Sequence, residues 1–419
     1  MSEGRRVVVT GTGAVTPLGL TAPETWEALL AGRSGIGPIT AFDPARLESR
    51  IAGEVKGFDA SGVMDRKEIR RNDRTTQMAL VAIAEALADA GLPDTLPEEL
   101  ALETGIVIGS GLGGAGTLIE QISLNATRGP ERLSPFFIPA AIGNIASGVA
   151  AMRFNAKGPN FAAVSACASG GHAIGEAAEM ILRGDATMML AGGAEATVYE
   201  ATVGGFAAMR ALSTRNDDPT AASRPWDRGR DGFVLAEGSA MLVLEEAAAA
   251  EARGARILGE IAGYGASADA SHITLPAPGG AGALRAARRA LQKAGVAADA
   301  IDLVLAHATS TPGGDMEELA AIRTLLGDHG PATSISALKS AVGHTLGAAG
   351  AIAAVAALHA IRDGRIPPTL NLTDPEPEVG DLDLTPLVAR SRTVDVALVN
   401  AFGFGGQNSA IVIRRWSGR

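Results

Sequence analysis

The sequence has a single cysteine, few aromatic residues and no long apolar run. Because Cys167 is alone among 419 residues, an intramolecular disulfide is excluded, which fits a reducing compartment such as the cytoplasm. Aromatic residues form only 4% of the chain whereas glycine occurs 53 times, so we expect close backbone packing in place of bulky anchors. The most apolar segment, residues 346–358, is shorter than the roughly 20 residues that cross a bilayer. We expect a buried helix there.

An excess of positive charge and a leader segment are also lacking. The net charge is −10, and an acidic balance of this size argues against nucleic acid as a partner. The first residues include basic side chains but lack the apolar region of a signal peptide. We therefore expect a cytoplasmic protein without membrane insertion.

What the chain does contain is an alternation of apolar, strand-like runs and Ala-rich helical segments. This pattern predicts an α/β protein. It starts with a strand at residues 7–10 that ends in the turn Gly11-Thr12-Gly13. Short strand, small-residue turn and Ala-rich helix occur at residues 160–183 and again at residues 334–362, which predicts two similar halves, residues 1–255 and 256–419.

Cys167 lies at the predicted junction between a strand, residues 160–165, and a helix, Ser169 to Arg183. The free N–H groups and the positive dipole at a helix start favour thiolate over thiol. A lone cysteine is more often a small buried hydrophobe, but the glycines and small residues around this one leave room for a ligand. The junction therefore predicts a nucleophile.

Two histidines also follow predicted strands, where open α/β sheets place their ligand sites. His307 precedes a run of Thr, Ser and Pro, and His344 lies at the predicted start of a helix that runs to Arg362. A helix start disfavours imidazolium, so His344 is expected to stay neutral and to donate a hydrogen bond. Helix, loop or surface roles are assigned to His172, His272, His329 and His359.

Two further motifs are less specific. The glycine-rich turn at residues 109–114 has the wrong spacing for a dinucleotide fingerprint, so a NAD site is rejected. The segment from Arg66 to Arg74 is strongly basic within an acidic protein. From charge alone, a solvated helix start and a docking site for an acidic partner are equally good interpretations.

The ordered set of motifs resembles the elongating, type II β-ketoacyl-acyl carrier protein synthases over nearly the whole chain. The most specific motifs are Ala-Cys-Ala-Ser-Gly around Cys167, His-Ala-Thr-Ser-Thr-Pro-Gly-Gly-Asp from His307, Lys-Ser-Ala-Val-Gly-His from Lys339 and Asn-Ala-Phe-Gly-Phe-Gly-Gly from Asn400. The resemblance implies a thiolase-like fold, with two similar βαβαβ halves in a layered αβαβα arrangement, and a homodimer.

The resemblance also implies a mechanism. Cys167 accepts an acyl chain from acyl carrier protein as a thioester, and malonyl-carrier protein then loses carbon dioxide and attacks it, which lengthens a fatty acid by two carbons. His307 and His344 donate hydrogen bonds to the enolate, and the N–H groups of Cys167 and Phe404 form the oxyanion hole. No cofactor or metal is implied, since the phosphopantetheine arm belongs to the carrier protein.

Other residues have supporting roles in this family. Lys339, paired with Glu318, supports the electrostatics of the site. The remaining implied residues are Thr309 and Thr311 for the pantetheine arm, Leu112 and Phe137 for the acyl pocket, one from each subunit, Phe402 as a further substrate contact, Phe404 as the gate, and Lys67, Arg71 and Arg210 for docking the acidic carrier protein. The last group favours the docking interpretation of the basic run.

Three departures from the family pattern leave substrate length and rate open: Ala168 and Gln407 stand where Thr is more usual, and Ala308 where Gly is. Related alternatives are a polyketide ketosynthase with a chain-length-factor partner and a non-elongating acyl-binding subunit, although retention of Cys167 argues against the second. A degradative thiolase would need a second cysteine. A cysteine hydrolase would need an activating pair with an orienting acid, which no motif singles out.

Overall fold

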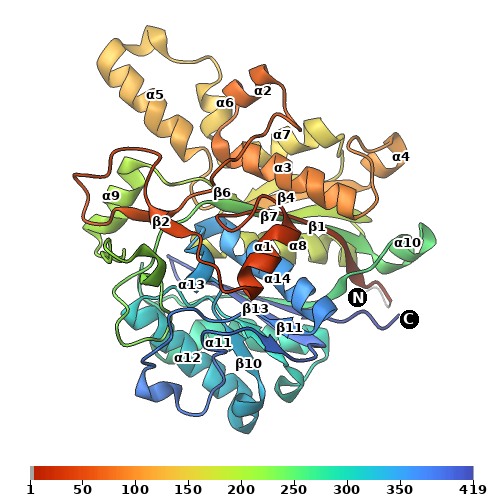
Figure 1. Cartoon of the computed structure of the whole chain (residues 1–419). Helices are drawn as coiled ribbons and strands as arrows, with labels where there is room; N and C mark the ends of the chain where they lie inside the picture. The colour runs from red at the N-terminus through yellow and green to blue at the C-terminus, as the bar shows by residue number, and fades with distance from the viewer. Residues whose placement is uncertain (1–3, 419) are drawn as a thin grey trace.

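The computed structural model describes residues 4–418 and is built on one ten-stranded sheet (Figure 1). The first half of the chain supplies five neighbouring strands, β5 (Asn160–Ala163), β4 (Thr104–Gly109), β6 (Met188–Glu195), β7 (Gly238–Glu246) and β1 (Val7–Val15). The second half supplies the next five, β8 (Gly259–Ala268), β14 (Gln407–Arg414), β13 (Val396–Gly403), β9 (Leu303–Leu305) and β10 (Ser334–Ser336). The halves join where β1 pairs with β8, at Val8 with Glu260 and Val9 with Gly259.

Both halves of the sheet have the same topology. Outward from the join, the first two pairings are antiparallel in each half, β1 with β7 and β7 with β6, and β8 with β14 and β14 with β13. The next two are parallel in each half, β6 with β4 and β4 with β5, and β13 with β9 and β9 with β10. The expected repeat of one α/β plan is confirmed. The predicted boundary at residue 255 lies in the connection to β8 and stays a prediction.

Two Ala-rich helices, α8 (Ser169–Arg183) and α14 (Ala349–Asp363), form the layer between the halves. α8 packs on β4, β6 and β14, α14 packs on β7 and β13, and the two helices contact each other. By length and composition, the segment Leu346–Asp363 could span a membrane, but 83% of it is buried inside the protein. The prediction of a buried helix is therefore confirmed.

The outer layers are formed by α3 (Arg74–Asp89) on β1 and β7 and by α11 (Ala281–Ala294) on β8 and β14. With each five-stranded half of the sheet counted as one β layer, the order of layers is αβαβα. Glycines in the strands allow these helices to approach closely. A Cβ atom on Gly11 would lie 2.1 Å from the carbonyl oxygen of Ala86, and one on Gly265 would lie 2.0 Å from that of Ala286. Abundant glycine thus brings helices onto the sheet, as expected.

The close approach of α3 to Gly11 corrects one prediction. The turn expected at Gly11-Thr12-Gly13 is wrong, because β1 continues through it to Val15. These glycines make room for α3 and do not reverse the chain.

The single helix expected from His344 to Arg362 is also wrong, since the chain forms α13 (Lys339–Val342), a 3-10 turn at Leu346–Ala348 and then α14.

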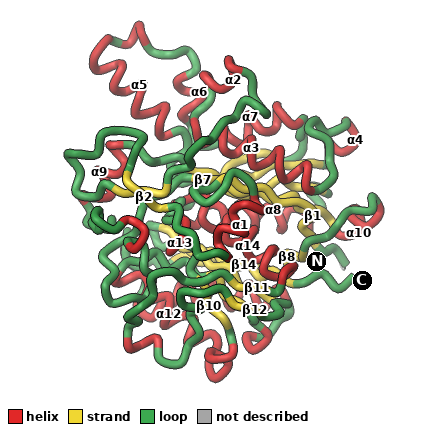
Figure 2. Tube along the Cα trace, viewed as in Figure 1, coloured by secondary structure: helices red, strands yellow, loops and turns green. Residues whose placement is uncertain are grey.

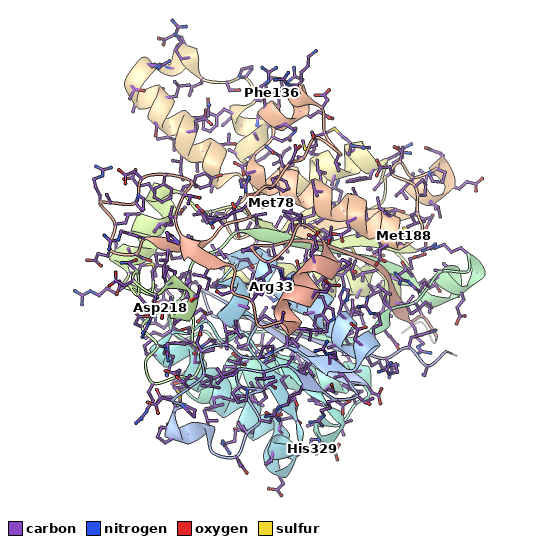
Figure 3. The ribbon with its side chains drawn as sticks, in the orientation of Figure 1. Arg33, Met78, Phe136, Met188, Asp218 and His329 are labelled. Carbon is purple, nitrogen blue, oxygen red and sulfur yellow. The ribbon has the colours of Figure 1, made fainter. Side chains whose placement is uncertain are left out.

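The remaining elements surround these layers, with loops concentrated on one side of the sheet and the two termini close together (Figures 1 and 2). They are α1 (Ala22–Leu30), α2 (Arg66–Arg71), α4 (Glu98–Ala101), α5 (Ala115–Arg128), α6 (Phe137–Ala141), α7 (Ile145–Phe154), α9 (Glu200–Ala208), α10 (Ala247–Ala252), α12 (Pro312–Leu326) and the small pairs β2 (Ile36–Pro38) with β3 (Ile51–Gly53) and β11 (Arg365–Ile366) with β12 (Arg390–Ser391). Figure 3 labels Met78, a fully buried residue of α3, and His329, at the far edge of the molecule.

Candidate active site

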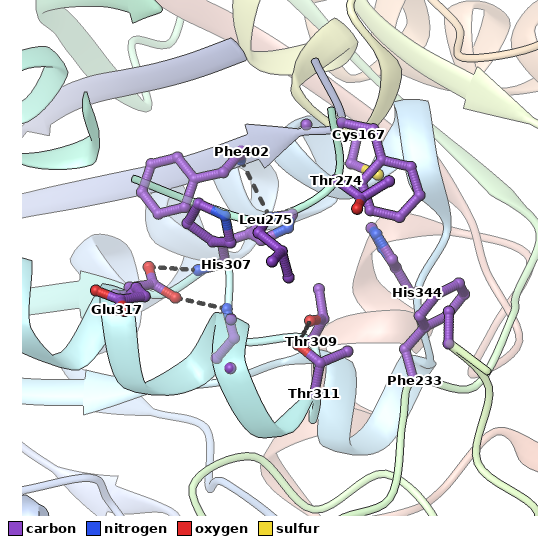
Figure 4. A pocket seen from close by; sticks show the side chains of 18 of the residues that line it. Cys167, Phe233, Thr274, Leu275, His307, Thr309, Thr311, Glu317, His344 and Phe402 are labelled. Carbon is purple, nitrogen blue, oxygen red and sulfur yellow. Dashed lines mark hydrogen bonds between the residues drawn. The ribbon is translucent and has the colours of Figure 1, made fainter. Parts of the chain in front are cut away.

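A cavity of about 300 Å³ takes its walls from both halves of the chain (Figure 4). Cys167 reaches it from the first half, and His307 and His344 reach it from the second. The structure therefore brings together the three groups that were predicted to react. The predicted residues that also line the cavity are Thr309, Thr311, Phe402, Phe404, Glu318 and Arg210.

Cys167 lies in the 3-10 turn Ala166–Ala168 between β5 and α8, at the strand-to-helix junction that the sequence predicted. Ala166 has a φ of 49°, a left-handed conformation that is unfavourable for a residue with a side chain. The hydroxyl of Ser169 fixes the turn, because it donates to the carbonyl of Ala166 at 2.6 Å and accepts from the N–H of Ser165 at 2.9 Å. The turn places the sulfur at the cavity wall.

The protonation state of Cys167 differs from the thiolate that the sequence predicted. Burial, with a smaller contribution from the charge of Glu195, raises the pKa of the Cys167 thiol to about 12. Lys339 and the N–H groups of Cys167 and Phe404 lower that pKa but only in part. The predicted preference for thiolate is wrong for the closed pocket, because desolvation outweighs the helix start. The same N–H groups nevertheless face the reacting atom, as an oxyanion hole requires.

His307 follows β9, and its hydrogen bonds define its tautomer. The N–H of Phe402 donates to Nδ1 of His307 at 3.2 Å, so Nδ1 carries no proton and Nε2–H is left as the donor. Burial, the charge of Lys339 and the neighbouring His344 hold the pKa of His307 well below its usual value. His307 is therefore a neutral hydrogen-bond donor at neutral pH.

His344 lies nearly perpendicular to His307, with their ring centroids 5.4 Å apart, and in Figure 4 the two rings approach the cavity from opposite sides. Its backbone pairs with Val234 and Ala236, so it lies in an extended segment and not at a helix start. The expected neutrality has another cause, since burial and then the charge of Lys339 hold the pKa of His344 well below normal. Nδ1 of His344 has no partner among the described residues.

Lys339 lies behind His307 and does not form the predicted pair with Glu318. Its ammonium group donates to the backbone carbonyl of His307 and lies 3.5 Å from Nδ1 of the same residue. Between these two described side chains no ion pair is formed, although the charge of Glu318 raises the pKa of Lys339. Burial is the larger effect and lowers the pKa of Lys339 to about 8. Lys339 therefore stays charged at pH 7 while its environment favours loss of the proton.

Glu318 instead supports the backbone that carries His307. Its carboxylate accepts from the N–H groups of His307 at 2.8 Å and Ala308 at 2.6 Å, and from the side-chain amide of Asn400 at 3.1 Å. Ala308, one of the departures from the family pattern, has a φ of 20°. This conformation accounts for the usual glycine at that position.

Sequence reasoning missed a second buried carboxylate, Glu195, at the end of β6. It accepts from the N–H groups of Gly111 at 2.6 Å, Leu112 at 3.1 Å and Gly347 at 3.0 Å, and from the hydroxyl of Ser110 at 3.0 Å. Burial raises its pKa. The only sequence signal was an acidic residue at the end of an otherwise apolar strand. Its partner in the other half, Gly347, is about 150 residues away and could not be read from the sequence.

Of the predicted substrate-binding and docking residues, some line this cavity and others do not. Thr309 and Thr311 line it with their hydroxyl oxygens 3.0 Å apart, and Arg210 is exposed at its wall. Leu112 and Phe137 are absent from its lining within one chain. Lys67 and Arg71 are exposed on α2, away from the cavity, and Arg71 lies over the ring of Phe136 at 4.4 Å.

Within residues 4–418, no group of three or more His, Cys, Asp or Glu side chains is arranged to hold a metal ion. The expected independence from cofactors stays a prediction. The chemistry of the site is that of a thiol, two neutral imidazoles, a buried ammonium group and backbone N–H donors. Such a set suits acyl transfer with stabilisation of an oxyanion.

A cysteine and two neutral histidines, placed by two repeated halves of thiolase-like fold, define a condensing enzyme of the acyltransferase class. Family models agree: "Beta-ketoacyl synthase, N-terminal domain" matches residues 4–250 and "Beta-ketoacyl synthase, C-terminal domain" matches residues 258–373. The chain belongs to the β-ketoacyl synthase family, which confirms the resemblance.

Similar proteins cover the whole chain. A 3-oxoacyl-acyl-carrier-protein synthase 2 of Synechocystis sp. is 48% identical over 414 residues, 99% of each chain. A β-ketoacyl synthase from Burkholderia phymatum has a solved structure with a TM-score of 0.92 and 37% identity, covering 99% of this chain and 100% of that one. A type II polyketide ketosynthase, solved in complex with its acyl-carrier protein, has a TM-score of 0.90 and 32% identity at the same coverage.

Proposed function

We propose that the protein is a 3-oxoacyl-acyl-carrier-protein synthase that elongates fatty acids by two carbons. The convergence of Cys167, His307 and His344 on one cavity carries the proposal. The name of the Synechocystis relative supports the fatty-acid substrate. A polyketide ketosynthase with a chain-length-factor partner is the second candidate, because a structural neighbour is a polyketide ketosynthase.

The first step is transfer of an acyl group to Cys167. The sulfur attacks the carbonyl of an acyl-carrier thioester, and the N–H groups of Cys167 and Phe404 stabilise the oxyanion that forms. The bond to the phosphopantetheine sulfur then breaks, and that thiolate takes up the proton that Cys167 loses. Because the pKa of Cys167 is about 12, proton loss accompanies attack and does not precede it.

The second step joins the two chains. Malonyl-carrier protein loses carbon dioxide, and the Nε2–H donor of His307, with a matching donor from His344, stabilises the enolate oxygen. The enolate carbon attacks the acyl-Cys167 carbonyl, and the new carbon–carbon bond displaces the cysteine thiolate, which is then protonated. Neutral imidazoles suit this step because an imidazolium would protonate the enolate. Lys339 keeps His307 neutral, and Glu318 fixes its position through the backbone.

The acyl carrier protein is the proposed partner, and its phosphopantetheine arm lies along Thr309 and Thr311. A complex of a related ketosynthase with its carrier protein supports this assignment. The exposed positive charges of Lys67, Arg71 and Arg210 are suited to an acidic surface. No cofactor, nucleic acid or membrane insertion is part of the proposal, and a cytoplasmic location fits it.

A homodimer is proposed as the working unit. β5 is the last strand of the sheet, and no other strand within residues 4–418 pairs with its outer edge. Apolar side chains beside it are exposed, with Met152 at 76% and Val164 at 62%, and a patch of this kind marks a protein interface. A second copy on this edge would cover them and would allow Leu112 and Phe137 to complete an acyl pocket from two subunits.

Intact-protein mass spectrometry tests the proposed function. Incubation with long-chain acyl-carrier protein should add the acyl mass to the wild type and not to Cys167→Ala, a loss of at least about 1,000-fold in loading rate. Malonyl-carrier protein should then remove this mass and yield a 3-oxoacyl product two carbons longer. Absence of loading for folded wild-type protein at every chain length would contradict the fatty-acid assignment, and an iterated polyketone product would favour the second candidate.

A further inference from the structure

His172, in the first turn of α8, connects the turn that carries Cys167 with β14, the strand that follows the turn of Phe404. Its Nδ1 lies 2.6 Å from the hydroxyl oxygen of Ser165, and its Nε2 lies 3.3 Å from the carbonyl oxygen of Asn408. Ser165 comes two residues before Cys167, and Asn408 comes four residues after Phe404. A single side chain therefore links a hydroxyl just before Cys167 to a backbone carbonyl just after Phe404.

The two partners determine the tautomer of His172. A backbone carbonyl only accepts, so Nε2 carries the proton and donates to Asn408. Nδ1 is then an acceptor, and the hydroxyl of Ser165 donates to it. Burial lowers the pKa of His172 although nearby Glu176 raises it, which favours this neutral form. The bridge thus has one donor and one acceptor with fixed directions.

The turn of Cys167 is also in direct contact with Gly403, the residue before Phe404. A Cβ atom on Gly403 would lie 2.5 Å from the carbonyl oxygen of Ser165 and 3.1 Å from the backbone nitrogen of Cys167. No side chain separates the two segments at this point, so the hydrogen bonds of His172 hold together segments that already touch. Donors in an oxyanion hole act only within a few tenths of an ångström of their working position.

We propose that His172 is a positioning residue that sets the spacing between the N–H groups of Cys167 and Phe404, and so the geometry of the oxyanion hole. This inference rests on the proposed function. The oxyanion at the acyl carbonyl forms during acyl transfer and condensation. It does not form when malonyl-carrier protein loses carbon dioxide, a step that depends on His307 and His344. Loss of the bridge should therefore slow acyl transfer and leave decarboxylation unchanged.

The test compares His172→Phe with His359→Phe in the full-length protein. Phe at residue 172 keeps a ring near Tyr264, whose centroid lies 6.3 Å away, and removes both hydrogen bonds. His359 is the matched control, because it is a buried histidine on α14 that stacks on Trp26 and has no hydrogen-bond partner among the described residues. Acyl loading of Cys167 is followed by intact mass, decarboxylation by carbon dioxide released from malonyl-carrier protein, and folding by thermal unfolding.

We expect His172→Phe to load acyl groups about 10-fold to 100-fold more slowly and to release carbon dioxide within two-fold of wild type. His359→Phe should match wild type in both. Equal slowing of both steps, or loading within two-fold of wild type, would overturn the inference. If His172→Phe unfolds, His172→Asn replaces it, since an amide oxygen can accept from Ser165 while the bond to Asn408 is lost. Slower loading than wild type with unchanged carbon dioxide release supports the bridge, and loading within two-fold of wild type refutes it. A wild type that never loads contradicts the proposed function instead.

Discussion

The two halves of the chain place different groups at equivalent positions of the same strand–turn–helix unit. In the first half, β5 leads to Ala166, with a φ of 49°, and then to Cys167. In the second half, β10 is followed by α13 and a turn in which Leu346, with a φ of 46°, precedes Gly347. Each turn opens a helix of the central layer. The backbone conformation is thus shared, and the residue that follows the left-handed position decides whether the turn holds a nucleophile or a backbone donor.

A second equivalence concerns the turns after β4 and β9. Glu195 accepts from the N–H groups of the first turn, and Glu318 accepts from those of the second, where His307 is carried. Both carboxylates are fully buried and have raised pKa values. Glu195 comes from a strand and Glu318 from a helix, so the halves reach the same support by different routes. The comparison predicts which substitutions disturb chemistry and which disturb only the fold.

The largest effect is expected at the histidines of the second half. His307→Ala or His344→Ala removes one enolate donor and should slow carbon dioxide release from malonyl-carrier protein about 100-fold to 1,000-fold. Acyl loading of Cys167, which depends on the first half and on Phe404, should fall by less than about 10-fold. Mass spectrometry of the loading step is the internal control. Equal losses in both steps would contradict this division of labour between the halves.

Lys339 should give the next largest effect, and it should depend on pH. Its charge is one cause of the low pKa of His307, so Lys339→Met should raise that pKa and move the acid limb of the decarboxylation profile to higher pH. In the wild type, the pKa of Lys339 is about 8. Above this pH the site loses a positive charge that stabilises the developing enolate, so the rate should fall about 10-fold. Lys339→Met should lack this alkaline limb, and its persistence would assign the limb to another group.

These residues also show what the sequence could and could not predict. The turn at Cys167 and the helix Ser169 to Arg183 follow from local signals, namely a short apolar strand, small residues and an Ala-rich run. The convergence of His307 and His344 followed from their motifs and from positions after strands. Local signals could not predict the protonated thiol, because its pKa depends on burial by segments distant in sequence.

The contacts of Lys339 and Glu195 were beyond the sequence for the same reason. The family resemblance implies a pair of Lys339 with Glu318, whereas the fold directs the ammonium group of Lys339 to a backbone carbonyl. The structural role of the glycines in β1 could not be read from the sequence either. Gly11 and Gly13 have the composition of a turn, and only the approach of α3 explains why the strand continues through them.

Substitutions of the two supporting carboxylates, Glu195 and Glu318, should differ more in their effect on enzyme activity than in their effect on stability. In Glu195→Gln and Glu318→Gln, the amide leaves a buried N–H without an acceptor, so each variant should lose about 1–3 kcal/mol of unfolding free energy. Denaturant titration measures this loss. Decarboxylation should fall by about 10-fold or more only in Glu318→Gln, because that turn carries His307. A comparable loss in Glu195→Gln would make both turns part of the catalytic geometry.

The smallest effect concerns the left-handed residue of the first half. Ala166→Gly relieves an unfavourable φ but gives the unfolded chain more freedom, so the unfolding free energy should change by less than about 1 kcal/mol. Ala348→Gly is the contrast, since Ala348 has a φ of −83° and gains no relief. That variant should be about 1 kcal/mol less stable. Equal losses in both would show that the turn at Cys167 is not strained.

The pairing of β1 has a consequence for synthesis of the chain. All nine residues of β1 are buried, and its antiparallel partner, β7, emerges about 230 residues later. At roughly 5–20 residues per second on a ribosome, this strand waits on the order of 10–50 s without a partner. Its second neighbour, β8, is made later still. The nascent chain therefore exposes an apolar strand until more than half of the chain has been translated. During that interval the strand must be shielded from aggregation by something other than its native partner strands.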